Sequence, residues 1–286
     1  MPDVSKAVLI TGCSTGIGRA TAERLVRGGH TVYATARRLE AIEDLEATGA
    51  RTLALDVNSE ESMQAAVAAV EEAEGAVGAL VNNAGYSQSG AVEGIPLDSL
   101  RSQFETNVFG LVRMCQLVLP AMRRQGHGRI VNVSSMGGKL TFPGGGAYHA
   151  TKHAVEALSD ALRWEVRGFG VRVVIVEPGL ITTRFGETAA GSLSEAEAPE
   201  TVDDPYASFN AAVGSATVGA YEGPMARLGA GPEAVAKVIE RAISSANPRP
   251  RYRVTASARL ALAQRRLLPY RAWDAVLRSQ FPSPGG

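Results

Sequence analysis

Cysteine, net charge and long apolar runs are scarce in this 286-residue chain. Cysteine occurs only at Cys13 and Cys115, in an apparent turn and in a helical pattern. We therefore expect no disulfide and a reducing, cytoplasmic environment. Lysine plus arginine number 29, as do aspartate plus glutamate, so no overall charge favours nucleic acid as a partner.

Hydrophobic segments of membrane-spanning or secretory type are also missing. No apolar run approaches the roughly 18 residues that a membrane-spanning helix requires. The first residues, MPDVSKAVLITG, have no basic stretch followed by a long apolar one, and we expect no signal peptide. Histidine, cysteine and carboxylate side chains nowhere show the spacing of metal ligands, so no metal is predicted.

Short β-branched runs alternate with longer helical patterns along the chain. The predicted strands are Ala7–Thr11, Thr31–Thr35, Arg51–Leu55, Ala79–Asn83, Arg129–Val133, Val171–Val176 and Arg251–Thr255. The predicted helices are Gly16–Arg27, Ser59–Glu74, Leu97–Arg124, Tyr148–Arg167 and Pro232–Ser244. Near-continuous apolar strands separated by helices predict an α/β fold, a doubly wound parallel sheet with helices on both faces. We expect one domain over residues 1–286, with ligands at the carboxyl ends of the strands.

A glycine-rich segment, TGCSTGIG (Thr11–Gly18), joins the first predicted strand to the first predicted helix. Glycines at these positions permit a tight turn and let the backbone and the helix N-terminus approach a pyrophosphate. The segment predicts a dinucleotide site with contacts from Gly12, Ser14, Thr15, Gly16, Ile17 and Gly18.

The end of the second strand distinguishes between the two nicotinamide cofactors. An acidic residue there would bind the ribose 2′-hydroxyl of NAD. The chain instead reads TARR, ending in Arg37 and Arg38. Because arginine forms charge-assisted hydrogen bonds with phosphate, this pattern favours NADP(H) over NAD(H). Two arginines on a solvated face are the alternative interpretation.

Tyr148 and Lys152 lie four residues apart in a predicted helix and therefore share one face. An ammonium group beside a phenol favours the phenolate, so we expect Lys152 to lower the Tyr148 pKa from its usual value of about 10. Such a phenol could donate and accept protons near neutral pH. The pair indicates acid–base chemistry, the alternative being an ordinary helix-face contact.

With NNAG (Asn82–Gly85), YHATK (Tyr148–Lys152) and PGLITT (Pro178–Thr183) following the glycine turn in order, the chain resembles the short-chain dehydrogenases/reductases. Within that family, TGCSTGIG, VYATARR and LRWEV are most similar to the hydroxysteroid and retinol dehydrogenase-like group. The resemblance implies reversible hydride transfer between NADP(H) and a carbonyl or secondary alcohol.

The resemblance also implies four catalytic residues. Tyr148 would exchange a proton with the substrate oxygen, and Lys152 would lower the Tyr148 pKa and bind the nicotinamide ribose. Ser135, thirteen residues before Tyr148, would polarise the substrate oxygen, with Ser134 as its competitor. Asn107 would hold a water that relays protons to Lys152, unless its amide is purely structural.

Further cofactor contacts follow from the same resemblance. They are Asp56 and Val57 at the adenine, Asn83, Ala84 and Gly85 beside the adenine ribose, and Pro178, Gly179, Ile181 and Thr183 at the nicotinamide. Tyr148 and Lys152 are expected to contact the cofactor as well. His149 and His153 are interpreted as surface or packing residues, because they point to other faces of the helix.

The expected substrate is apolar. Met136, Leu140, Phe142, Leu180 and Phe185 lie near the predicted pocket and favour a steroid-, retinoid- or polyketide-like molecule. The GGG run before Tyr148 (Gly144–Gly146) suggests bare backbone with room for a bulky ligand. Residues 186–225, small and acidic, are interpreted as a substrate lid or as a surface insertion without a role.

The C-terminal residues are basic and amphipathic. From Arg249 onward there are eight arginines and one acid, Asp274, a net charge of +7. Within residues 257–281, one apolar stripe contains Leu260, Ala263 and Leu267, and another contains Tyr270, Trp273, Leu277 and Phe281. The sequence favours two helices packed on an acidic domain over contact with a membrane surface.

Two further expectations concern assembly and activity. The helices Leu97–Arg124 and Tyr148–Arg167 could pair with their copies in a homodimer or homotetramer, the alternative being a monomer. A sensor or scaffold that binds the dinucleotide without turnover is the alternative to an enzyme, and a related lyase or epimerase is a third class. The presence of Tyr148, Lys152 and Ser135 together favours the enzyme.

Overall fold

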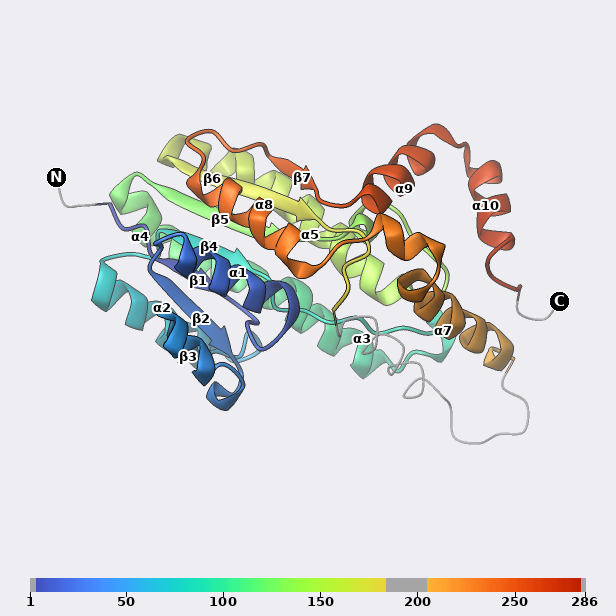
Figure 1. Cartoon of the computed structure of the whole chain (residues 1–286), viewed down its shortest axis with the longest axis horizontal. Helices are drawn as coiled ribbons and strands as arrows, with labels where there is room; N and C mark the ends of the chain where they lie inside the picture. The colour runs from blue at the N-terminus through green and yellow to red at the C-terminus, as the bar shows by residue number, and fades with distance from the viewer. Residues whose placement is uncertain (1–3, 184–204, 284–286) are drawn as a thin grey trace.

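In the computed structural model, residues 4–183 and 205–283 are described, with only the backbone described at Pro224 and Met225. Seven parallel strands form one sheet in the order β3-β2-β1-β4-β5-β6-β7 (Figure 1). They are β1 Val8–Ile10, β2 Val32–Ala36, β3 Arg51–Ala54, β4 Ala79–Asn82, β5 Gly128–Val133, β6 Val171–Glu177 and β7 Arg251–Arg253. All seven predicted strands are thus confirmed, within a few residues at their ends.

The described helices are α1 Gly16–Arg27, α2 Glu60–Glu74, α3 Leu97–Phe104, α4 Gly110–Gln125, α5 Gly146–Glu165, α7 Ala207–Glu222, α8 Pro232–Ser244, α9 Ala256–Leu267 and α10 Tyr270–Arg278. The predicted helix over Leu97–Arg124 is confirmed in extent, because the backbone stays helical throughout, but it is divided in two. A π-helical turn at Glu105–Phe109 separates α3 from α4. Helical periodicity reads much the same on both sides of such a turn, so the pattern of apolar residues could not reveal it.

Apolar residues on both faces of the strands explain why helices cover the sheet on two sides. Val8 and Ile10 of β1 pack with α1 and α8 in one core, whereas the intervening Leu9 packs with α2 and α4 in the other. Side chains alternate between faces along a strand, so a continuous apolar run supplies both cores. The result is the predicted layered α/β arrangement.

The order of the strands reverses between β1 and β4. From β1 the chain builds outward through β2 and β3, and then returns to place β4 on the other side of β1. The loops after these two strands therefore diverge and leave a crevice at the carboxyl edge of the sheet. Ligands are expected at this point.

An ionic network attaches the short edge strand β7 to the body of the protein. The Arg251 guanidinium lies 3.1 Å from a carboxylate oxygen of Glu156 on α5 and 3.2 Å from one of Glu177 at the end of β6. Both glutamates are buried. Burial and the neighbouring Glu156 raise the Glu177 pKa, against the effect of Arg253 and Arg251. Arg251 thus compensates two carboxylates that have lost their water.

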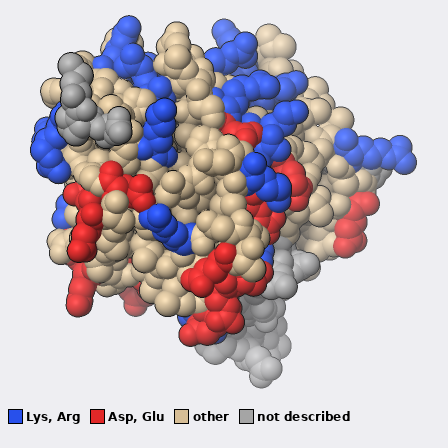
Figure 2. All heavy atoms as spheres, turned by 60° about the vertical axis from the view of Figure 1, so that its left-hand side comes forward, with Lys and Arg blue, Asp and Glu red and all other residues tan. Residues whose placement is uncertain are grey.

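The surface carries both signs of charge and several exposed aromatic side chains. Figure 2 shows acidic and basic groups together on one face of the molecule. Trp164 on α5 and Phe109, in the π-helical turn before α4, are 63% and 55% exposed. These side chains lie on the two helical segments that were expected to pair between subunits, and the homo-oligomer stays a prediction.

Replacing Arg251 by methionine should lower the free energy of unfolding by about 2 kcal/mol, because the buried Glu156 and Glu177 would lose their shared cation and keep only Lys139 and Arg253 as ionic partners. Arg249→Met is the matched control, since Arg249 is exposed and makes no ion pair with any described residue. This control should change the free energy by no more than about 0.5 kcal/mol. Urea unfolding measures both, and equal effects would contradict the role assigned to Arg251.

Candidate active site

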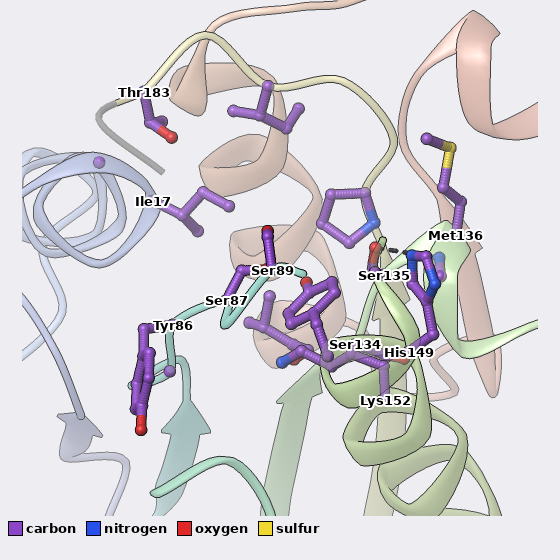
Figure 3. A pocket seen from close by; sticks show the side chains of 18 of the residues that line it. Ile17, Tyr86, Ser87, Ser89, Ser134, Ser135, Met136, His149, Lys152 and Thr183 are labelled. Carbon is purple, nitrogen blue, oxygen red and sulfur yellow. Dashed lines mark hydrogen bonds between the residues drawn. The ribbon is translucent and has the colours of Figure 1, made fainter. Parts of the chain in front are cut away.

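A cavity of about 970 Å³ lies at the carboxyl edge of the sheet, where the strand order reverses. Residues that follow β1, β2, β3, β4, β5 and β6 line it. Figure 3 shows Ser134, Ser135, His149 and Lys152 together on one side of the cavity, with Ile17 and Thr183 on the opposite side. The cavity therefore combines the predicted nucleotide-binding turn with the predicted catalytic residues.

The turn after β1 has the shape that its glycines predict. Gly12 and Gly16 have φ angles of +74° and +60°, in the left-handed region that favours glycine. A Cβ atom at Gly18 would lie 2.3 Å from the Gly12 carbonyl oxygen, so only glycine fits there. Asn83 secures the turn from β4, because its Nδ2 donates to the carbonyl oxygens of Thr11 and Gly12 at 3.0 Å.

The start of α1 is suited to bind an anion beside this turn. Thr15 precedes the helix without a side-chain capping hydrogen bond, and the first turn has no acidic residue. Amide groups at such a helix start, with the helix dipole behind them, attract phosphate. Gly12, Ser14, Thr15, Gly16 and Ile17 line the cavity, whereas Gly18 allows the close packing underneath. These residues fit the pyrophosphate of a dinucleotide.

The two arginines after β2 occupy different positions relative to the cavity. Both side chains are exposed, but Arg37 lines the cavity and Arg38 does not. Neither forms an ion pair with any residue in the described ranges. The guanidinium of Arg37 is therefore available to an anionic ligand at this end of the cavity.

Most other predicted cofactor contacts also lie at the cavity. Asp56, Val57, Asn83, Ala84 and Gly85 line it, as do Pro178, Gly179, Ile181 and Thr183. Gly179 has no room for a side chain, because a Cβ atom there would lie 2.3 Å from Thr255 Oγ1 at the start of α9. The turn after β6 thus lines the cavity on one side and packs closely against the start of α9 on the other.

Tyr148 and Ser135 meet at the centre of the cavity. Tyr148 lies in the first turn of α5, and Ser135 follows β5 at the start of a short helical turn. The Ser135 hydroxyl accepts a hydrogen bond from Gly137 N at 3.0 Å and forms another with Tyr148. Ser134 is buried, and its hydroxyl has no partner among the described residues. The contact with Tyr148 thus distinguishes Ser135 from Ser134.

Burial dominates the electrostatics of Tyr148 and Lys152. Burial raises the Tyr148 pKa, against a smaller lowering by the hydrogen bond from Ser135. Lys152 donates through Nζ to the Val133 carbonyl oxygen at 2.9 Å, and its Nζ lies 5.7 Å from the centre of the Tyr148 ring. The expected lowering of the Tyr148 pKa by Lys152 was therefore wrong for this structure, because the ammonium is directed at the backbone of β5.

Burial acts on Lys152 in the opposite direction. The Lys152 pKa is lowered to about 8 by burial, although the charge of Glu156 raises it. A buried ammonium loses hydration that one backbone carbonyl only partly replaces. The charge state of Lys152 consequently changes in a pH range where most lysines stay protonated.

Asn107 occupies the π-helical turn between α3 and α4. Its Oδ1 accepts from Tyr86 N at 3.1 Å, and its Nδ2 donates to Tyr86 O at 2.9 Å and to Thr151 Oγ1 at 3.1 Å. The amide therefore fixes the loop after β4 against α5. Gly85 keeps the space between Asn107 and Lys152 open, since a Cβ atom there would lie 2.9 Å from Asn107 Oδ1 and 3.8 Å from Lys152 Nζ.

His149 is buried, as its interpretation as a packing residue allows, but it also lies at the cavity, which its place on another face of the helix did not suggest. Its imidazole is buried and lines the cavity, in edge contact with the rings of Tyr148 and Phe142, whereas His153 is exposed. His149 Nδ1 accepts a hydrogen bond from Phe142 N at 3.3 Å. Burial lowers the His149 pKa to about 4, so the ring is neutral at physiological pH.

The glycines of the GGG run allow side chains of the protein to pack closely against the backbone. A Cβ atom at Gly145 would lie 2.5 Å from the His149 ring, and one at Gly144 would lie 2.4 Å from Val213 of α7. Gly144 and Gly145 do line the cavity, as expected, but His149 and Val213 fill the space beside them that was expected to be open for a bulky substrate. Sequence spacing alone could not show that the ring of His149 folds back over Gly145.

Part of the cavity wall was missed by the sequence analysis. Three C-terminal elements contribute to this wall: α7, α9 and the residues after α10. The lining residues are Val213, Ala216, Thr217, Ala220 and Tyr221 of α7, Ser257 and Ala261 of α9, and Gln280 and Phe281 after α10. A long helix was not foreseen within residues 186–225, because small residues there obscure any helical stripe. The described part of that segment, from residue 205, does overhang the carboxyl edge, whereas residues 186–204 of the predicted lid lie outside the described ranges.

Among the expected apolar contacts, Met136, Phe142 and Leu180 line the cavity. Leu140 is 2% exposed and is packed in the interior instead. Phe185 lies outside the described residues. Within the described ranges, no group of three or more histidine, cysteine or acidic side chains could hold a metal ion, and no helix is long and apolar enough to cross a membrane.

Residues 6–192 match the family model described as short chain dehydrogenase. An Escherichia coli protein named uncharacterized oxidoreductase YbbO is 36% identical over 276 residues, 96% of this chain and 95% of that protein. Retinol dehydrogenase 8 of Bos taurus is 35% identical over 258 residues, 87% and 81% of the two chains. A 3-ketodihydrosphingosine reductase of Bacteroides thetaiotaomicron is 41% identical over 178 residues, 62% and 65% of the two chains.

Solved structures with the same fold include complexes with both nicotinamide cofactors. A short-chain dehydrogenase from Streptomyces avermitilis is 33% identical, with a TM-score of 0.73 over 97% of this chain and 96% of that one. A serine dehydrogenase complexed with NADP+ is 27% identical, with a TM-score of 0.74 over 87% and 94%. A short chain dehydrogenase/reductase from Burkholderia phymatum in complex with NAD is 27% identical, with a TM-score of 0.76 over 99% and 97%.

The lowered pKa of Lys152 can be measured directly, because the chain has only four lysines, Lys6, Lys139, Lys152 and Lys237. In ¹³C NMR of protein labelled at lysine Cε, one resonance should titrate near pH 8. Lys152→Met should remove that resonance, and the exposed control Lys237→Met should leave it. Because an unfolded lysine keeps its proton to about pH 10.4, this group should make the protein more stable as pH rises from about 8 to that value. A Lys152 resonance titrating near pH 10.4 would contradict the account.

Proposed function

The chain belongs to the short-chain dehydrogenase family, and on that premise we propose that it reduces an apolar ketone or aldehyde reversibly with NADPH. Membership makes it an oxidoreductase that acts on a hydroxyl or carbonyl group and binds a nicotinamide dinucleotide. One observation carries the finer proposal: Ser135, Tyr148 and Lys152 line the same cavity as Arg37.

Arg37 supports the preference for NADP(H). Its side chain lines the cavity beyond β2, where Ala36 and Arg37 stand in place of the acidic residue that would bind a ribose 2′-hydroxyl. The 2′-phosphate of NADP(H) would be held by its guanidinium, and the pyrophosphate by the glycine turn and the start of α1. Solved structures of similar proteins contain either NADP+ or NAD. The proposed preference for NADP(H) therefore depends on Arg37 and not on similarity to these proteins.

The bound dinucleotide supplies the hydride, and the protein controls the proton and the charge on oxygen. Tyr148 is proposed as the general acid toward the substrate oxygen. Its raised pKa keeps the phenol protonated at neutral pH, as reduction requires. Ser135, already hydrogen-bonded to Tyr148, would donate to the same oxygen and stabilise the developing negative charge.

Lys152 and Asn107 are proposed to replenish the proton on Tyr148. The Lys152 pKa of about 8 allows the ammonium to release and regain a proton near neutral pH. Asn107 Nδ2 uses both hydrogens on Tyr86 and Thr151, so a relay water would donate to Oδ1. Oδ1 accepts only the Tyr86 N–H within the described residues and has a lone pair left for this purpose.

Apolar substrates are proposed from the cavity wall. Met136, Phe142, Leu180, Val213 and Phe281 present apolar side chains to it. The relatives named for retinol and for 3-ketodihydrosphingosine act, by those names, on long apolar molecules. The two buried free thiols, Cys13 and Cys115, fit the proposed cytoplasmic location.

Tyr148→Phe should lower kcat for NADPH-dependent reduction by about 10²–10⁴-fold, because it removes the general acid and keeps the ring. The NADPH dissociation constant should change little, which fluorescence titration would show. As a matched control, Tyr206→Phe removes a phenol that bonds to the exposed Glu93 outside the site, and kcat should be nearly unchanged. Normal turnover of Tyr148→Phe would remove Tyr148 from the mechanism.

Arg37→Ala should weaken NADPH binding by about tenfold or more and leave NADH binding nearly unchanged, because only NADPH carries the 2′-phosphate. Arg38→Ala is the matched control: it removes the same charge from the neighbouring position, which does not line the cavity. Its effect on both cofactors should be small. Equal weakening of NADPH and NADH by Arg37→Ala would show that this side chain does not recognise the phosphate.

A further inference from the structure

The C-terminal arm, defined as residues 256–283 with helices α9 and α10, has one side fixed to the active-site cavity. Ser257 Oγ accepts from Leu180 N at 3.1 Å, which ties the start of α9 to the turn after β6. The Trp273 ring, 5% exposed, lies 6.1 Å from the ring of Phe142. Phe281 packs near Phe209 and lines the cavity. In Figure 1 the arm projects beyond the carboxyl edge of the sheet.

The other side of the arm presents an apolar stripe to solvent. Leu260, Leu267 and Tyr270 are 46%, 80% and 74% exposed, and Ala263 between them is exposed as well. Positions 260, 263 and 267 share one face of α9 by helical spacing. The two helices do pack on the domain, as the sequence favoured, but through Ala258, Leu262 and Trp273. The predicted stripe of α9 was expected to make this contact, and it faces solvent instead.

Arginines border this stripe, and no acidic side chain of the described residues pairs with them. The arm contains Arg259, Arg265, Arg266, Arg271 and Arg278 against the single acid Asp274, a net charge of +4. None of the five arginines forms an ion pair with a described residue. The expectation that they balance the charge of an acidic domain stays a prediction; within the described residues, Arg251 and Arg253 of β7 are the C-terminal arginines that pair with buried carboxylates. Arg265 lies over the Tyr270 ring at 4.4 Å.

We propose that the outer face of the C-terminal arm docks on an anionic lipid surface, with Leu260, Leu267 and Tyr270 in the interface and the arginines on lipid phosphates. A helix with an apolar stripe and a basic border binds such a surface in the plane of the interface. Each arginine near an anionic membrane adds to the attraction. Docking there brings the cavity, which the inner side of the same arm lines, to molecules dissolved in the bilayer.

Charge distinguishes lipid from a second copy of the chain as the occupant. A twofold interface places the same patch of both subunits face to face. With a net charge of +4, this patch would repel itself, whereas an anionic surface compensates every arginine. The docking proposal does not depend on the proposed substrate or cofactor, because binding to lipid can be measured without either.

Flotation of the full-length protein with vesicles tests the proposal. Vesicles of phosphatidylcholine containing about one third phosphatidylglycerol should carry the protein at low salt, and those of phosphatidylcholine alone should carry far less. Arg259→Gln with Arg266→Gln should lower the partition coefficient on anionic vesicles by about tenfold or more. Leu260→Ser with Leu267→Ser should lower it by a similar factor, through lost apolar burial.

The matched controls remove the same groups elsewhere on the surface. Arg27 and Arg241 are exposed on α1 and α8, so Arg27→Gln with Arg241→Gln removes the same net charge. Leu39 and Leu97 are 42% and 57% exposed, so Leu39→Ser with Leu97→Ser removes two comparable leucines. Both control variants should float like the wild type. All substituted side chains are exposed, and an unchanged thermal midpoint verifies folding in each variant.

Three results would overturn the proposal. The first is wild-type protein that does not float with anionic vesicles at low salt. The second is arm variants that partition as well as the controls. The third is a mass by light scattering that falls when Leu260 and Leu267 are replaced, which would assign the stripe to contact between copies of the chain.

Discussion

The hydrogen bond from the buried Lys152 ammonium to the Val133 carbonyl oxygen fixes the geometry on which the site depends. It joins α5 to the end of β5, and so sets the distance between Tyr148, one turn earlier on the helix, and Ser135, two residues beyond the strand. The same burial makes the ammonium easier to deprotonate and the phenol harder to ionise. The positions of Lys152 and Tyr148 and the shifts of their pKa values therefore have one cause, the burial of α5 against the sheet.

The strands of the parallel sheet have apolar residues on both faces, so polar side chains that take part in binding lie mainly at the strand ends. This constraint gathers the glycine turn after β1, Asn83 after β4, Ser135 after β5 and Gly179 after β6 at one edge. The C-terminal arm and α7 then enclose the edge from the side opposite the nucleotide-binding turn. Backbone and glycines thus line the cavity near β1, and apolar side chains line it near α7 and the C-terminal arm.

Much of this arrangement could be predicted from the sequence, because strand periodicity and glycine spacing are local signals. The seven strands and the turn at Gly12–Gly18 are examples. Tyr148, Lys152 and Ser135 were expected at the site from the resemblance to the short-chain dehydrogenases, and all three line the cavity. Side-chain direction could not be predicted. Lys152 donates to the backbone of β5 rather than to the phenol, His149 folds over Gly145, and Leu260 faces solvent. Each outcome depends on neighbours distant in sequence, which periodicity does not describe.

Transfer of isotope from cofactor to product tests the central claim, hydride transfer to a carbonyl, most directly. The protein would be incubated with NADPH carrying deuterium at C4 of the nicotinamide and with a panel of apolar ketones and aldehydes. Mass spectrometry should find an alcohol with one deuterium on the former carbonyl carbon. Tight binding of NADPH without deuterium in any alcohol would contradict the account and would identify a dinucleotide-binding protein that does not turn over these carbonyls.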